Sequence, residues 1–122
     1  MFNFTKLVTS FRYAFAGLKY TISNNQNVKI HLIIACLVLA LGLILNLSKE
    51  ELLALGVMTV LVLAAEMINT TVEEVVNLLV NEHRQEAKTA KDVAAGMVLL
   101  IALFAAVIGL VIFIPHILKL FR

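Results

Sequence analysis

Three long apolar segments, separated by short polar stretches, dominate the hydrophobic pattern of the chain. They cover residues 30–47, 52–68 and 93–114, and the third contains 22 residues without a charge. About 20 apolar residues in a helix cross the hydrocarbon core of a bilayer, so the third segment is predicted to be a transmembrane helix that Pro115 ends. The first two segments are shorter, and the polar turn between them predicts a hairpin of two further transmembrane helices.

The first 27 residues follow a different pattern. Apolar side chains recur at helical spacing from Phe4 to Ile22, and Lys6, Arg12 and Lys19 lie between them. This pattern is typical of an amphipathic helix that lies in the membrane interface. A helix packed on a partner protein would have the same pattern, and the three predicted spans that follow favour the interface.

The composition indicates an integral membrane protein. Of the 122 residues, 61% are hydrophobic and 15% are charged, and the mean hydropathy is +0.98. Such a chain lacks the polar surface that a soluble domain of this size needs. We therefore predict an all-α fold, with 1–122 as a single membrane domain and 1–27 as its interfacial helix. The net charge of +2 is too small to indicate a nucleic-acid partner.

The basic residues predict how the chain is oriented in the membrane. They gather before the first span and between the second and third spans: Lys6, Arg12, Lys19, Lys29, Arg84, Lys88 and Lys91. Since basic residues favour the cytoplasmic side, the N-terminus and the segment 69–92 are predicted to be cytoplasmic, in a multi-pass protein of the inner (plasma) membrane. The helix that starts at Leu52 could continue past Ile68 into this segment, as far as about Val80.

A row of polar residues begins inside the second span. Glu66, Asn69, Glu73 and Asn77 are spaced 3, 4 and 4 residues apart, which places them on one face of a helix. A carboxylate at membrane depth is costly and usually serves a function. Hydrogen bonding to a neighbouring helix is the alternative for Glu66, and it is the simpler explanation for the two asparagines.

Carboxylates and lysines at a cytoplasmic membrane boundary suit phosphoryl transfer. This reaction needs oxygen ligands for Mg²⁺, cations that face the phosphates and a base beside the accepting hydroxyl. Glu73 could hold the metal, Lys91 could neutralise phosphate, and Glu66, lying deeper, could act as the general base for a lipid alcohol. The sequence has no Walker A loop, so a nucleotide site would not be of a common soluble kind.

These segments resemble a known family. AEMINTTVEEVVNLL resembles the E-x-x-N-S/T-x-x-E-x-x-x-D signature of the prokaryotic diacylglycerol kinase family, and AKTAKDVAAGMVLL resembles its AKD segment. FRYAFAGLKY and NVKIHLIIA resemble its surface helix and the entry to its first span, and the KIH and KDVAAG forms are similar to its undecaprenol kinase branch. The resemblance implies a homotrimer with composite active sites that transfers the γ-phosphate of ATP to undecaprenol or diacylglycerol with Mg²⁺.

The resemblance also implies roles for individual residues. Glu66 resembles the general base next to the lipid substrate, and Glu73 resembles the metal-binding carboxylate that also serves the nucleotide. Lys6 stands where the family usually has a basic residue near the substrate. The remaining positions resemble nucleotide contacts: Tyr13, Asn69, Glu82, Lys91 and Asp92.

The chain departs from the family pattern at acidic positions. Asn25 stands where the family has a second metal-binding Glu, and its neutral carbonyl oxygen would be a weaker Mg²⁺ ligand. Asn77 stands where Asp is usual. These changes leave open a catalytically impaired relative that acts as a membrane scaffold or lipid binder. A small proton-coupled transporter with Glu66 as its proton site is a further alternative, although such proteins usually have four spans.

Overall fold

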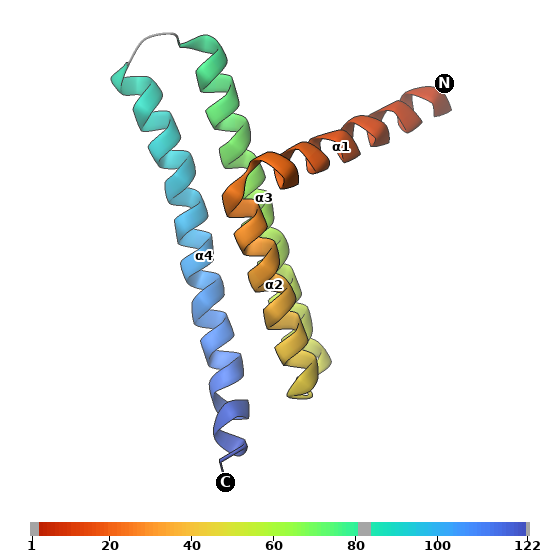
Figure 1. Ribbon diagram of the computed structural model, residues 1–122, viewed down its shortest axis with the longest axis vertical. Coiled ribbons are helices and arrows are strands. Elements are labelled where there is room, and N and C mark those ends of the chain that lie inside the picture. The colour runs from red at the N-terminus through yellow and green to blue at the C-terminus, as the bar shows by residue number, and fades with distance from the viewer. Residues whose placement is uncertain (1–2, 81–83, 122) are drawn as a thin grey trace.

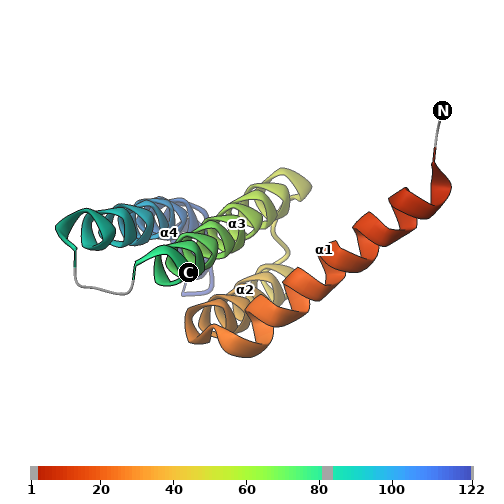
Figure 2. The ribbon, with the colours of Figure 1, turned by 90° about the horizontal axis from the view of Figure 1, so that it is seen from above.

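The protein is entirely helical in the residues that the computed structural model describes, which are 3–80 and 84–121. Four helices follow one another: α1 (Phe4–Asn24), α2 (Gln26–Ile44), α3 (Lys49–Leu79) and α4 (Gln85–Lys119). The helices α2, α3 and α4 form a bundle in which α3 packs between the other two, and α1 extends away from one end of it (Figures 1 and 2). Each bundle helix is long and apolar enough to cross a membrane, which confirms the predicted all-α fold with three long apolar helices.

One asparagine makes the sharp turn between α1 and α2. Asn25 has an extended backbone, and its side-chain oxygen accepts hydrogen bonds from the backbone N–H groups of Asn27 at 2.8 Å and Val28 at 3.3 Å. A side chain in this position satisfies N–H groups that the first turn of a helix leaves without partners. The first helix therefore ends at Asn24, and α2 begins at Gln26, inside the segment 1–27 that was predicted as the interfacial helix.

The turn between α2 and α3 is also built from polar side chains. Asn46 has a positive φ of 53°, a conformation that asparagine adopts more readily than most residues. Ser48 and Glu51 then form a capping box, in which each side chain accepts a hydrogen bond from the backbone N–H of the other residue. This turn reverses the chain and sets α3 antiparallel to α2.

Two helices extend beyond the predicted spans. α3 is one helix as far as Leu79, so the polar row from Glu66 to Asn77 lies on continuous helix. α4 begins at Gln85 and runs through Pro115 to Lys119. The prediction that Pro115 ends the helix is therefore wrong. Proline removes only one backbone donor, and long apolar helices with other stabilising contacts tolerate that loss.

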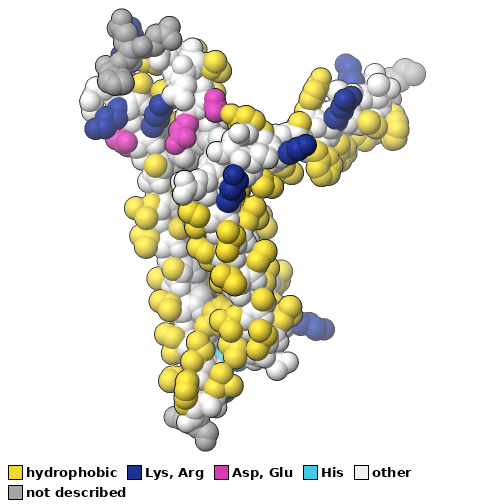
Figure 3. Space-filling model, in the orientation of Figure 1, with side chains coloured by type: hydrophobic (Ala, Val, Ile, Leu, Met, Phe, Trp, Pro, Cys, Tyr) yellow, Lys and Arg dark blue, Asp and Glu magenta, His cyan; other side chains and the backbone are white. Residues whose placement is uncertain are grey.

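Few side chains are buried within one chain. The buried apolar ones are small or medium in size and line the helix contacts: Val28, Ala35, Leu47, Leu55, Val62, Ala65, Ala94 and Val98. Most large apolar side chains are exposed, and Figure 3 shows them covering the bundle, with charged side chains gathered at the end where α1 joins. An apolar band with one polar end suits a helix bundle in a bilayer.

Candidate active site

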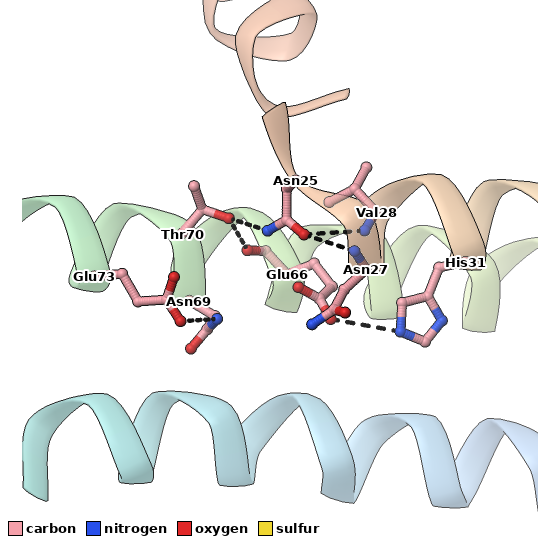
Figure 4. Close-up of polar contacts among 8 residues, drawn as sticks. All are labelled: Asn25, Asn27, Val28, His31, Glu66, Asn69, Thr70 and Glu73. Atoms are coloured by element: carbon pink, nitrogen blue, oxygen red, sulfur yellow. Dashed lines mark hydrogen bonds and ion pairs between the residues drawn. The ribbon is translucent and has the colours of Figure 1, made fainter. Parts of the chain in front are cut away.

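Glu66 is the most deeply buried polar side chain of the bundle. It lies on α3 with 2% of its surface exposed, and His31 Nε2 of α2 is 3.5 Å from its Oε1 (Figure 4). Its second oxygen, Oε2, is buried and has no hydrogen-bond partner among the residues that the structure describes. Buried polar atoms almost always have partners, so a carboxylate oxygen without one needs an explanation, such as a catalytic role or a bound water or ion.

A cavity of about 330 Å³ opens beside this carboxylate. Its polar lining comes from α2 and α3, and its apolar lining comes mainly from α4. In Figure 4 the side chains of Asn27, His31, Glu66 and Asn69 point into the space between α3 and α4. The cavity therefore offers a carboxylate oxygen at one wall and hydrocarbon at the opposite wall, an arrangement that suits the hydroxyl end of a lipid.

Asn69 continues the polar row one turn toward the polar end. It is 5% exposed, and its Nδ2 donates to Glu73 Oε1 at 3.0 Å. Its Oδ1 is buried without a partner in the described part of the chain. Asn69 borders the cavity beside Glu66 and a second cavity beside Glu73, so it links the two.

The second cavity, of about 240 Å³, lies between the α1–α2 turn and α3. Asn25 Nδ2 donates to Thr70 Oγ1 at 2.7 Å, and Thr70 Oγ1 donates to the backbone oxygen of Glu66 at 2.9 Å. Through Thr70, Asn25 thus connects the α1–α2 turn to the backbone of Glu66, whose side chain lines the first cavity. This cavity is mostly polar, and Glu73 and Glu74 both border it.

A contact between α1 and α3 closes one side of the second cavity. The Tyr20 hydroxyl donates to Glu74 Oε1 at 2.9 Å, although both residues are exposed. This hydrogen bond, together with the negative charge of the carboxylate, raises the pKa of Tyr20 above its ordinary value of 10.0. Glu74 is thus a partner that helps to fix α1 against the bundle.

The predicted metal ligands, Glu73 and Asn25, border the same cavity. The oxygen of Asn25 already accepts two backbone hydrogen bonds, whereas Glu73 carries a half-buried carboxylate. Within the described residues, no group of three or more acidic, histidine or cysteine side chains could hold a metal. Mg²⁺ usually keeps several waters and binds through one or two carboxylates together with substrate phosphates, so Glu73 fits that need. Asn25 as a ligand stays a prediction.

The residues of α4 that were predicted to bind nucleotide differ in whether they contact the polar row. Lys91 of α4 donates from Nζ to Asn77 Oδ1 at 2.6 Å, so the polar row on α3 meets a cation from α4. Asp92, the next residue on α4, is exposed. Glu82 lies outside the described residues.

Tyr13 and Lys6 are not near Glu66 within one chain. Both lie on the part of α1 that extends away from the bundle, where Tyr13 is 71% exposed (Figure 1). A role for these residues at the same site requires a bundle from another copy, as the composite-site prediction implies. That assembly stays a prediction.

Sequence reasoning missed the contact between His31 and Glu66. His31 was not among the predicted site residues, and the structure places its ring beside the carboxylate. The sequence contained a signal for the inward direction of His31 but not for its partner, because the apolar residues Val28 and Ala35, which the structure buries, lie three positions before and four positions after it. That spacing places all three on one helix face. The contact of Asn25 with Thr70 left no such signal in the sequence.

Comparisons with known proteins identify the family. A family model described as prokaryotic diacylglycerol kinase matches residues 12–113. A diacylglycerol kinase of Synechocystis sp. is 38% identical over 115 residues, which cover 93% of this chain and 66% of that protein. An undecaprenol kinase of Bacillus subtilis is 36% identical over 106 residues, which cover 87% of this chain and 86% of that protein.

A third relative extends the agreement. A diacylglycerol kinase of Haemophilus influenzae is 30% identical over 94 residues, which cover 77% of this chain and 80% of that protein. The chain spans just under two thirds of the Synechocystis protein but most of the other two. The family match covers α2 and α3 completely and most of α4, and it includes every residue of the polar row. The chain therefore belongs to the prokaryotic diacylglycerol kinase family, a family of lipid kinases.

Proposed function

We propose that this protein transfers the γ-phosphate of ATP to the hydroxyl group of a membrane lipid alcohol, either undecaprenol or diacylglycerol. The observation that carries the proposal is the carboxylate of Glu66, which is buried at a cavity with one oxygen left without a partner among the described residues. The names of the relatives, diacylglycerol kinase and undecaprenol kinase, support both acceptors.

Glu66 is proposed as the general base. Its Oε2 would accept the hydroxyl proton while the lipid oxygen bonds to the γ-phosphorus and the bond to the oxygen that bridges the β- and γ-phosphates breaks, releasing ADP. A base must lie within hydrogen-bond reach of the proton that it removes, and this role is supported by the place of Glu66 in the cavity lining and by its Oε2, which is without a partner among the described residues.

The polar row would hold the nucleotide on the side of Glu66 that faces the polar end of the bundle. Mg²⁺ bound with the phosphates would neutralise their negative charge, and Glu73 is the carboxylate best placed to hold it. Lys91 would give a cation to the phosphates in exchange for its contact with Asn77. Asn69 lies between the two carboxylates, and its free oxygen could orient the phosphoryl group or the acceptor hydroxyl.

We further propose a homotrimer with the N-terminus in the cytoplasm. The outward extension of α1, with Tyr13 and Lys6 far from the cavity of their own chain, supports a site that is completed by a neighbouring copy. The exposed apolar faces of the bundle helices provide surface for such an assembly and for the surrounding lipid.

A phosphate-transfer assay tests the proposed function. Purified protein would receive ATP and Mg²⁺ with undecaprenol or diacylglycerol in parallel, and Glu66→Gln would be compared with Glu86→Gln, an exposed acid of α4. General-base catalysis contributes about 10²–10⁴ to a rate, so Glu66→Gln should lower kcat by that factor while the trimer stays intact. Glu86→Gln should match the wild type. Full transfer by Glu66→Gln would refute the role of Glu66.

A second candidate function is a catalytically inactive member that binds lipid or supports other membrane proteins. The engagement of the Asn25 oxygen in the helix cap favours it, since this position would otherwise supply a second metal ligand. Folded, trimeric wild-type protein that transfers phosphate to neither lipid, but binds one of them, would support this function in place of the kinase.

A further inference from the structure

His31 belongs to the inward face of α2. Val28 and Ala35, one turn to either side of it, are buried, and the His31 ring is about three quarters buried. Its Nε2 lies 3.5 Å from Glu66 Oε1, so this oxygen is the nearest acceptor recorded for a hydrogen on Nε2, which the protonated ring and one of the two neutral tautomers carry. Oε2, on the other side of the same carboxylate, has no partner among the described residues.

We propose that His31 is a positioning residue for Glu66: it donates from Nε2 to Oε1 and thereby leaves Oε2 as the oxygen that accepts the proton of the lipid hydroxyl. This role rests on the proposed kinase function. The reaction itself is unchanged, because the proton still passes from the acceptor hydroxyl to Glu66. His31 fixes which oxygen receives it and from which direction.

Among the described residues that line the cavity, the polar neighbours of Glu66 are Asn27, His31 and Asn69, and of these only His31 has a recorded side-chain contact with its carboxylate. From α4, the described residues at the cavity are apolar: Ala95, Val98, Leu99 and Ala102. The Asn69 amide donates to Glu73 instead of Glu66. The titratable groups that line the cavity are therefore Glu66 and His31, one from each of two packed helices.

The distance of 3.5 Å is long for a hydrogen bond, as is common at catalytic sites without substrate. Without the ring, the carboxylate could rotate about its side-chain bonds, and a misplacement of about 1 Å can cost about 100-fold in rate.

His31 also stands at a boundary between two environments. It lines the cavity beside Glu66 and, deeper in the bundle, an apolar cavity of about 500 Å³ between α2, α3 and α4. The ring therefore lies where a polar end and a hydrocarbon chain would meet. This location is suited to holding a base at the depth of a lipid hydroxyl.

Three variants test the role in the phosphate-transfer assay: His31→Leu, His31→Gln and His116→Leu. The amide nitrogen of Gln reaches close to the position of Nε2, so His31→Gln keeps a donor, whereas His31→Leu removes it. His116 has similar exposure and lies 3.6 Å from Glu51 at the α2–α3 turn, so it serves as the matched control. We expect His31→Leu to lower kcat about 10- to 100-fold with the KM for ATP unchanged, His31→Gln to recover most of that loss, and His116→Leu to match the wild type.

A measurement that does not depend on activity accompanies the assay. In ¹⁵N-histidine-labelled protein, NMR should show a hydrogen on His31 Nε2, and Glu66→Gln should shift the resonance of that nitrogen. An unchanged resonance would overturn the hydrogen bond from His31 to Glu66. Equal loss of kcat in His31→Leu and His31→Gln would overturn the positioning role of the donor. If His31→Leu does not fold, His31→Gln and the NMR shift decide the question.

The two proposals fail in different ways. A wild-type protein that transfers no phosphate would overturn the kinase function and this role together. An active wild type whose kcat is unaffected by the folded His31→Leu variant would overturn only the role of His31.

Discussion

Asn25 makes more contacts than its place in a short turn suggests, and removing its side chain should destabilise the protein measurably. In Asn25→Ala the first turn of α2 loses its cap, which costs about 1 kcal/mol. The hydrogen bond to Thr70 is lost as well, which costs about 1 kcal/mol for a half-buried side-chain pair. The expected total is about 2 kcal/mol in the free energy of unfolding.

Unfolding in mixed micelles, followed by circular dichroism as the fraction of denaturing detergent rises, would measure this cost. Asn24→Ala is the matched control, because Asn24 is exposed and its amide makes only a local bond to the backbone oxygen of Tyr20. We expect the control to lie within about 0.5 kcal/mol of the wild type. An equally small change in Asn25→Ala would refute the argument that this side chain anchors α2 and the turn.

Asn25→Asp separates the structural role of this position from its predicted metal role. Aspartate caps a helix about as well as asparagine, so the loss of stability should be confined to the bond with Thr70, about 1 kcal/mol. The new carboxylate would border the same cavity as Glu73, and the Mg²⁺ concentration for half-maximal activity should fall. An unchanged Mg²⁺ requirement would show that position 25 does not face the metal.

Two further predictions concern α1 and α4. Because the pKa of Tyr20 is raised, the stability that its bond to Glu74 contributes is fully present below pH 10.0 and is lost as the pH rises through the raised pKa. In a Tyr13→Phe variant, Tyr20 is the remaining tyrosine, and its ultraviolet absorbance should show a titration above pH 10.0. Adding Glu74→Gln should bring that titration back toward pH 10.0. Lys91→Met should raise the KM for ATP about tenfold through loss of one charged contact, whereas Lys88→Met, an exposed neighbour on the same helix, should leave it unchanged.

The fold was predictable because helix length and hydrophobic spacing are local properties. The apolar segments 52–68 and 93–114 fall within α3 and α4, whereas 30–47 extends three residues past the end of α2 at Ile44, into the turn. The spacing of the polar row correctly placed Glu66 and Asn69 on an inward face. The end of α4 was mispredicted at Pro115, since the sequence rule counts the lost donor and ignores the rest of a long helix. The motifs of α3 and α4 were sufficient to predict the family that the comparisons confirm.

The site was only partly predictable, because its contacts join residues that are distant in sequence. Nothing in the spacing within either helix pairs His31 with Glu66, or Asn25 with Thr70, since each contact depends on how α2 and its preceding turn pack on α3. The roles of Tyr13 and Lys6 came from family resemblance alone. Within one chain their helix points away from the cavity, so their contribution depends on an assembly that a single chain cannot specify.

The gradient of burial along α3 explains why the proposed base and metal ligand are two turns apart. Glu66 is buried, Glu73 is half-buried and Asn77 is exposed, so one helix face passes from the interior to the polar end. At a rise of about 1.5 Å per residue, Glu66 and Glu73 lie about 10 Å apart along the axis. A lipid hydroxyl held at the first and a nucleotide held at the second would therefore meet beside Asn69, whose buried oxygen is without a partner in the described part of the chain. A base at the polar end would be better solvated but too far from a hydroxyl held at the depth of Glu66.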